Sequence, residues 1–258
     1  MSIEPAPSTV TAAAADRQLG RPVAAYRPDL ASSGARTALW VIAVAAALLL
    51  VVGLTTGSLV AIIVAVPFLA LFGYQAISRE YVRGRVQGTA LHLFEYGLVK
   101  TEQDGSVAPM RYDSTTMWFR FVVHKQTNGY VTSRKFHMHL TDLVTGRVCE
   151  LYGFVDGQTW SDSIRRGVFD ARQPTLVQQL GEGRPLTFGP LVISPAGLEA
   201  KGKSVPWAAV RDVTVDGGLG SIDIQGKRLP WFVATTEEVP DFDIAVHLIR
   251  SGLRPGGN

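Results

Sequence analysis

The pattern of hydrophobic and polar positions divides the chain into three regions. Residues 37–78 contain no Asp, Glu, Lys, Arg or His. Beyond residue 85, short alternating apolar and polar runs are bounded by Gly, Asp and Pro, which is typical of antiparallel β structure. Residues 1–36 are rich in Ala, Pro and Ser and show no sustained apolar period. We therefore predict a disordered cytoplasmic N-terminal tail over residues 1–36.

The uncharged region predicts two transmembrane helices. A single helix over its 42 residues would be about 63 Å long, roughly twice the hydrocarbon thickness of a bilayer, so the segment has to fold back on itself. The stretch from Gly53 to Ser58 supplies the break. We expect a helical hairpin, with transmembrane helix 1 over residues 37–56 and transmembrane helix 2 over residues 58–78.

The residues flanking this hairpin predict its orientation. Arginines precede the first span and follow the second, whereas the connecting loop is uncharged, so the positive-inside rule places both termini in the cytoplasm. A cleaved signal peptide and a buried soluble hairpin are the alternatives, and the late position of the apolar stretch and its lack of a polar face disfavour them. We expect a multi-pass protein of the plasma (inner) membrane. The expected anchoring and orienting residues are Arg36, Trp40, Tyr74, Arg79, Arg83 and Arg85.

The region beyond residue 85 repeats itself. Leu91–Val99 resembles Leu191–Glu199, each with an alternating strand, a turn that carries a glycine and a leucine that begins the return strand. Arg111–Trp118 then corresponds to Pro206–Val213, where an aromatic residue leads into a further strand. This pattern predicts two copies of one small β unit.

Each copy ends in a stretch with helical periodicity. Apolar residues at helical spacing predict one helix in each copy, and a further short helix is predicted from Pro174 to Gly181. The apolar stripes are Trp160, Ile164 and Val168 in the first copy, and Phe242, Ala245, Val246 and Ile249 in the second.

Several strands followed by one amphipathic helix is the layout of pleckstrin-homology-like domains. The chain resembles bacterial membrane-anchored proteins with pleckstrin-homology-like repeats. More closely, it resembles an actinobacterial family of unknown function that pairs two such repeats with a transmembrane hairpin. The resemblance is based on Gly20–Tyr26, Tyr96–Leu98, Phe188–Leu191, Gly197–Leu198 and Pro206–Trp207.

This resemblance implies the fold class. We expect a membrane-anchored α+β chain with a two-helix transmembrane hairpin and two tandem pleckstrin-homology-like domains. Each domain is a small antiparallel β barrel with a C-terminal helix, and the two cover residues 86–181 and 184–252.

Composition and charge narrow the range of partners. There are 25 Lys and Arg against 22 Asp and Glu, a net charge of +3, and no basic cluster with interleaved aromatic residues. We therefore expect no nucleic-acid partner. The single cysteine, Cys149, cannot form an intramolecular disulfide.

Few residues suggest chemistry. His137 and His139, with Glu150 across a turn, have ligand types suited to a metal. Strand alternation instead places both histidines on the polar face, so a solvated strand is favoured and no metal is expected. No nucleophile with a base and no phosphate loop is recognisable, so we expect neither an enzyme nor a cofactor. The hairpin Lys100–Arg111 mixes basic and acidic residues, which departs from the phosphoinositide-binding pattern.

These observations favour a binding function. We expect a scaffold or recruiting protein that presents its cytoplasmic repeats to an unknown protein partner at the inner membrane face. The lipid bilayer and a second copy of the chain are further expected partners. The alternative is an accessory subunit of a transporter or sensor complex, whose hairpin contacts other helices through Gly53, Gly57 and Gly73.

Overall fold

The structure is a computed structural model. It describes residues 7–29, 33–57, 66–67, 69, 88–125 and 131–252. The chain divides into two compact units, one of Met1–Arg27 with Ala90–Asn258 and the other of Pro28–Thr89. The larger unit contains two β-rich parts, which we call lobe 1 (residues 7–27 and 90–181) and lobe 2 (residues 186–252).

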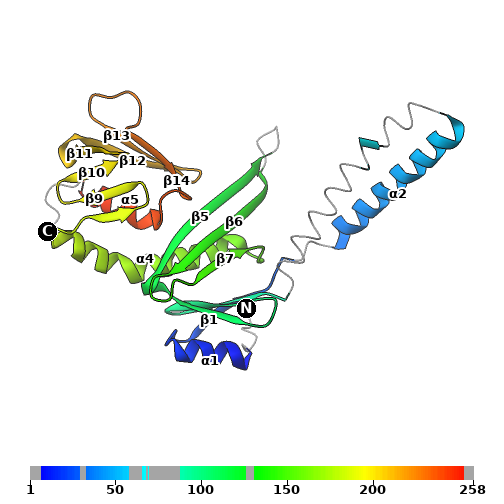
Figure 1. The fold of residues 1–258 in the computed structure, drawn as a ribbon, viewed down its shortest axis with the longest axis horizontal. Coiled ribbons are helices and arrows are strands. Elements are labelled where there is room, and N and C mark those ends of the chain that lie inside the picture. Colours follow the sequence, from blue (N-terminus) through cyan, green and yellow to red (C-terminus); the bar gives the residue numbers. More distant parts are fainter. Residues whose placement is uncertain are drawn as a thin grey trace. The chain divides into compact units, whose positions relative to one another are not determined.

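Lobe 1 is built from two small antiparallel sheets and a long helix (Figure 1). The first sheet has the strand order β1-β2-β3-β4 and the second the order β5-β6-β7. A one-turn 3-10 helix that begins at Tyr112 joins the two sheets. The elements are β1 (Pro22–Tyr26), β2 (Ala90–Phe94), β3 (Gly97–Thr101), β4 (Val107–Arg111), β5 (Thr115–Lys125), β6 (Val131–Asp142), β7 (Val148–Tyr152) and α4 (Gly157–Gly181).

Lobe 2 repeats this order of elements. Its four-stranded sheet has the order β11-β10-β9-β8, its three-stranded sheet the order β12-β13-β14, and a 3-10 turn that begins at Trp207 joins them. The elements are β8 (Leu186–Phe188), β9 (Leu191–Ser194), β10 (Gly197–Ala200), β11 (Lys203–Pro206), β12 (Val210–Asp216), β13 (Leu219–Ile224), β14 (Phe232–Thr235) and α5 (Phe242–Gly252). In both lobes, alternate residues of the strands point into a core that the helix covers.

Helix α4 contributes to both cores. Trp160, Ile164 and Val168 are buried in the core of lobe 1, which confirms the predicted apolar stripe. Further along, Phe169, Leu176 and Leu180 pack against the core of lobe 2. The separate short helix predicted from Pro174 is wrong, because Pro174 lies inside one continuous helix. A proline weakens a helix locally, and here packing on both sides of it maintains the helix.

The N-terminal segment is part of lobe 1. Helix α1 (Ser8–Asp16) packs on the first sheet, and its Val10 and Ala14, together with Leu19 that follows it, form a core cluster with Phe94 and Val99. Strand β1 pairs antiparallel with β2. The predicted disorder over residues 1–36 is therefore wrong for the described residues 7–29, because distant strands supply the apolar partners that the segment itself lacks.

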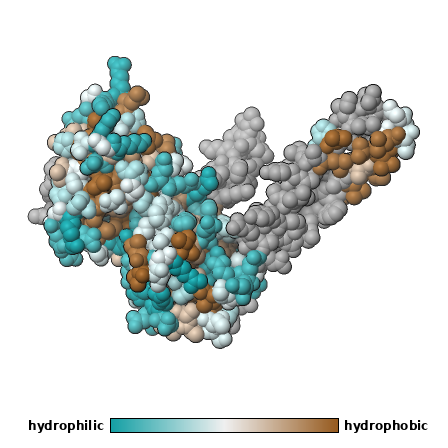
Figure 2. All heavy atoms as spheres, in the orientation of Figure 1, coloured by the Kyte–Doolittle hydropathy of each residue, from teal (hydrophilic) through white to brown (hydrophobic). Residues whose placement is uncertain are grey.

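The smaller unit contains helix α2 (Ser33–Thr56), which ends at Gly57 in a left-handed conformation. Most of its described side chains are apolar, and Val41, Leu48 and Leu54 are exposed, whereas the hydroxyls of Thr55 and Thr56 donate to carbonyls of the preceding turn. Brown, hydrophobic spheres cover much of this helix in Figure 2. Of residues 58–78, predicted as the second transmembrane helix, the structure describes only 66, 67 and 69.

The predicted fold class, a membrane-anchored α+β chain with a transmembrane hairpin, is wrong. Over the residues that the structure describes, small antiparallel sheets predominate, and no helix is both long and apolar enough to span a membrane. The prediction relied on the absence of charge over residues 37–78. A transmembrane hairpin requires two continuous apolar helices of about 20 residues each, and the described part of the chain contains no such pair. The transmembrane hairpin and the multi-pass inner-membrane location are corrected accordingly.

The turn between β6 and β7 generates a prediction about acid stability. The buried Asp142 accepts hydrogen bonds from the Thr145 hydroxyl (2.7 Å) and the Val144 N–H (3.0 Å), and Arg17 lies 3.9 Å away. Burial alone would raise the pKa of the Asp142 carboxyl, but these hydrogen bonds and the arginine together lower it. The carboxylate therefore stabilises the fold above its unfolded pKa of about 3.9, and this contribution is lost as the pH falls through the lower folded value.

We predict that Asp142→Asn lowers the free energy of unfolding at pH 7 by about 1 kcal/mol and reduces its loss between pH 5 and pH 2. Urea unfolding at each pH measures both effects. An unchanged pH dependence in the variant would contradict the assignment.

Candidate functional site

Lobe 2 contacts lobe 1 through residues 235–243, from the end of β14 to the first residues of α5, which we call the docking segment. It lies along the outer edge of strand β5. The Phe119 N–H donates to the Thr236 carbonyl (3.3 Å), and the Asp241 N–H donates to the Met117 carbonyl (2.7 Å). The Met117 N–H in turn donates to Asp241 Oδ1 (3.0 Å). The edge of β5 is therefore occupied by a segment of the chain itself.

A buried ion pair holds this segment. The Asp241 side chain is 4% exposed and pairs with Arg172 of α4, which is 12% exposed. Arg172 also donates to the Thr115 carbonyl (3.0 Å) and the Thr116 hydroxyl (3.2 Å). Burial raises the pKa of the Asp241 carboxyl, and the positive charge of Arg172 opposes that rise. A buried charge is costly without its partner, so this pair fixes the docking segment against α4.

A second, more exposed ion pair involves Asp243, two residues further along the segment. Arg165 of α4 donates from Nε to Asp243 Oδ2 (2.8 Å) and from Nη2 to Asp243 Oδ1 (2.7 Å). The guanidinium also lies over the Phe119 ring, 4.8 Å from its centroid. Lobe 1 thus receives the docking segment with a strand edge, an aromatic ring and an arginine that binds a carboxylate.

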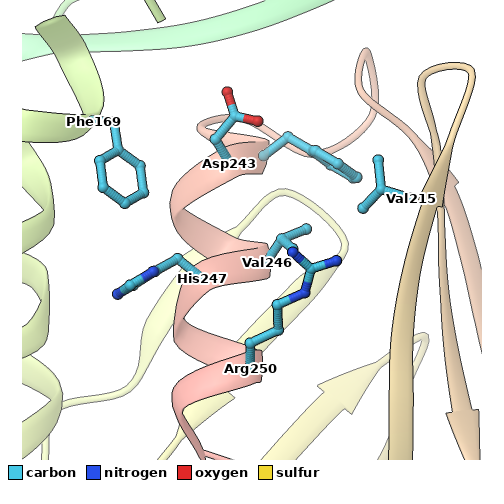
Figure 3. Close-up of a pocket in the computed structure, with 7 residues that line it drawn as sticks. Phe169, Val215, Asp243, Val246, His247 and Arg250 are labelled. Carbon is cyan, nitrogen blue, oxygen red and sulfur yellow. The ribbon is translucent and has the colours of Figure 1, made fainter. Parts of the chain in front are cut away.

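Lobe 2 has a groove of its own beside α5. It encloses a cavity of about 320 Å³. Figure 3 shows Phe169 on α4 at one side, Val215 on β12 at the other, and Val246 and Arg250 of α5 between them. His247 stands edge-on to Phe169, with ring centroids 5.3 Å apart. The remaining lining residues are Phe242 and Asp243.

The space that the docking segment fills in lobe 1 and the groove of lobe 2 occupy equivalent positions in the two lobes. In lobe 1, Gly167 of α4 lies against the ring of Tyr112, and a Cβ on this glycine would be 2.5 Å from that ring. In lobe 2, Gly252 lies against Trp207 in the same way, at 2.8 Å. Tyr112 and Trp207 each begin the 3-10 turn between the sheets. The residue two positions before each glycine is an arginine, so Arg165 and Arg250 are equivalent.

The edge strands correspond as well. Met117 of β5 pairs with Leu140, and Val213 of β12 pairs with Ile222. An irregularity between Val210 and Asp212 shifts β12 by one position relative to the sequence alignment of the two copies, so Val213 is equivalent to Met117. Val215 is therefore equivalent to Phe119, over whose ring the Arg165 guanidinium lies in lobe 1. In lobe 1 the docking segment fills this space, whereas in lobe 2 the equivalent space is the groove.

The residues predicted to anchor a membrane hairpin are not brought together by the described structure. Arg36 and Trp40 lie in helix α2, where the structure describes their backbone but not their side chains. Tyr74, Arg79, Arg83 and Arg85 also lie outside the described residues.

The predicted metal-ligand candidates are neighbours on the second sheet of lobe 1. His139 pairs directly with Glu150, and both His137 and His139 line a cavity of about 360 Å³. The His139 ring stands edge-on to Trp118, with centroids 5.6 Å apart. Within the described ranges, no three His, Cys, Asp or Glu side chains lie close enough to hold a metal ion.

Other residues considered in the sequence are engaged locally. Lys100 pairs with Glu102 at 2.9 Å, and Arg111 with Asp113 at 2.8 Å. Burial raises the pKa of the Cys149 thiol to about 12, so it is protonated at neutral pH.

Sequence reasoning missed the residues of the docking contact and of the groove. The ion pairs join residues 69 and 78 positions apart, and no local pattern reports such pairs. One signal was available, because Arg165–Gly167 and Arg250–Gly252 share the spacing Arg-x-Gly at the ends of corresponding stripes.

The comparisons with known proteins give a family without an assigned activity. Residues 6–256 match a family described as a family of unknown function (DUF6585). Neither a curated protein nor a solved structure matches the chain.

The two ion pairs generate a prediction about the docking contact. We expect Asp241→Ala to lower the free energy of unfolding by about 3–5 kcal/mol, because it leaves Arg172 buried without a partner. Asp243→Ala removes a pair whose side chains are each about one-third exposed, and we expect a loss of about 1 kcal/mol.

Urea unfolding of both variants measures the difference. Equal losses in the two variants would contradict the assignment of the buried pair as the principal contact.

Proposed function

We propose that this chain, which belongs to the DUF6585 family of unknown function, is a binding scaffold whose lobe 2 groove holds a segment of a partner protein. The observation that supports this most directly is the internal comparison of the two lobes. The groove of lobe 1 receives a peptide segment, the docking segment. The equivalent groove of lobe 2 has a cavity of about 320 Å³ and apolar lining residues.

The way the lobes are joined suits such a role. Helix α4 packs into both cores, and two ion pairs hold the docking segment, so lobe 2 is fixed against lobe 1. A groove on a rigid support loses less conformational entropy on binding than a mobile one. Lobe 1 would then serve as the support and lobe 2 as the binding surface.

This proposal retains the binding function expected from the sequence without its membrane setting. The accessory-subunit alternative depended on the transmembrane hairpin and loses its premise with it. The expectations that the chain is not an enzyme and needs no cofactor stay predictions.

A peptide selection tests the proposal. The full chain is presented with a random decapeptide display library, and the enriched peptides are then measured against two variants. Val215→Trp places a large ring in the groove, whereas Val233→Trp places one on another strand of the same sheet. The two valines are matched in exposure, at 44% and 41%.

We expect the enriched peptides to lose binding at least tenfold to Val215→Trp and to bind Val233→Trp as they bind the unchanged chain. Circular dichroism and thermal unfolding of both variants check that the fold is intact. Peptides that bind Val215→Trp with undiminished affinity would contradict the proposal.

A further inference from the structure

We infer that the lobe 2 groove takes an acidic peptide, whose backbone pairs with the edge of β12 and whose carboxylate binds Arg250. This inference rests on the proposed function, and it adds the chemistry of the partner segment. It follows from three features of the groove: its strand edge, its arginine and the charges around it.

The first feature is the edge of β12. This strand is at the end of its sheet, in the order β12-β13-β14. Asp216 and Leu219 flank a two-residue turn and so form a hydrogen-bonded pair. Bonded and non-bonded pairs alternate along antiparallel strands, so the backbone groups of Val213 and Val215 point away from β13, toward the open edge.

The state of these groups differs between the lobes. The Met117 N–H of β5 donates to the carboxylate of the docking segment, at 3.0 Å. The equivalent Val213 N–H donates instead to the carboxylate of its neighbour Asp212, at 2.8 Å. A carboxylate therefore occupies this position in both lobes, but only in lobe 1 does it come from a bound segment. An open strand edge of this kind is a template for an added strand.

The second feature is Arg250. Its equivalent in lobe 1, Arg165, binds a carboxylate of the docking segment in a bidentate manner. Among the residues that the structure describes, none forms an ion pair with Arg250. Arginine presents a planar pair of donors that matches a carboxylate, so the equivalent position predicts an acidic residue in the partner.

The third feature is the balance of charge in the groove. Of the residues that line the cavity, Arg250 and His247 are basic and Asp243 is acidic, while the Asp212 carboxylate lies at the strand edge on the Val213 N–H. Asp243 is already neutralised by the bidentate contact with Arg165. Between Arg250 and Val215 the surface is apolar, formed by Phe242 and Val246. A segment that suits this lining carries an acidic residue next to apolar ones.

The test extends the peptide selection with an arginine variant and its matched control. Arg250→Gln removes the charge in the groove. Arg228→Gln removes the same charge from an exposed position between β13 and β14, outside the groove. The enriched decapeptides are sequenced, and their dissociation constants are measured by fluorescence anisotropy with the full chain and both variants.

We expect the enriched peptides to be rich in Asp and Glu, and to bind Arg250→Gln about fivefold more weakly. Replacing the critical acidic residue of a peptide by its amide should cost the same factor, and the two changes together should cost little more than either alone. Arg228→Gln should leave binding unchanged.

The outcomes separate this inference from the proposed function. Peptides that are sensitive to Val215→Trp but neutral in composition, or indifferent to Arg250→Gln, would overturn the acidic partner and leave the binding groove in place. Peptides that are indifferent to Val215→Trp would overturn both.

Discussion

The arrangement of this protein depends on one buried ion pair, between Arg172 and Asp241. Asp241 has a left-handed backbone conformation, with φ of 49°, and a side chain almost excluded from solvent. Both features are unfavourable in isolation. They are tolerated because Arg172 and the backbone of Met117 satisfy the carboxylate and the amide together. Through this contact, the segment that leads into α5 is tied to the helix that closes lobe 1.

The same contact explains why the two lobes differ in their surfaces. Each lobe has a three-stranded sheet whose first strand, β5 or β12, pairs with only one other strand of the sheet. An exposed strand edge of this kind can pair with another chain. In lobe 1 the docking segment covers that edge. In lobe 2, no segment among the described residues makes the equivalent backbone hydrogen bonds to the edge of β12.

Individual strands and helices of the two lobes could be predicted from the sequence, but the fold class could not. Alternation located most of the strands beyond residue 85, and helical spacing located Trp160, Ile164 and Val168 on one buried face. Predictions from local composition were less successful. The N-terminal tail folds because residues about 70 positions away complete its sheet, and Pro174 stays helical because both cores pack on α4. The absence of charge over residues 37–78 suggested membrane helices, which the described structure does not support.

The candidate site was less predictable than the fold. The site is recognised only by comparing the two lobes. The role of Arg250 is inferred from its equivalence to Arg165, which binds a carboxylate. A repeat was visible in the sequence, but which of its two grooves is filled depends on contacts between distant residues. Histidines were the conspicuous candidates, whereas the arginines are the residues that the structure brings to the grooves.

The central claim is that the strand edge of lobe 1 is closed and that of lobe 2 is open. Amide hydrogen exchange of the full chain, resolved by residue with nuclear magnetic resonance, tests this most directly. The account predicts strong protection of the Phe119 amide, which donates to Thr236, and exchange of the Val215 amide at close to the rate of an exposed amide. Equal protection of the two amides would show that the edge of β12 is also covered and would contradict the account.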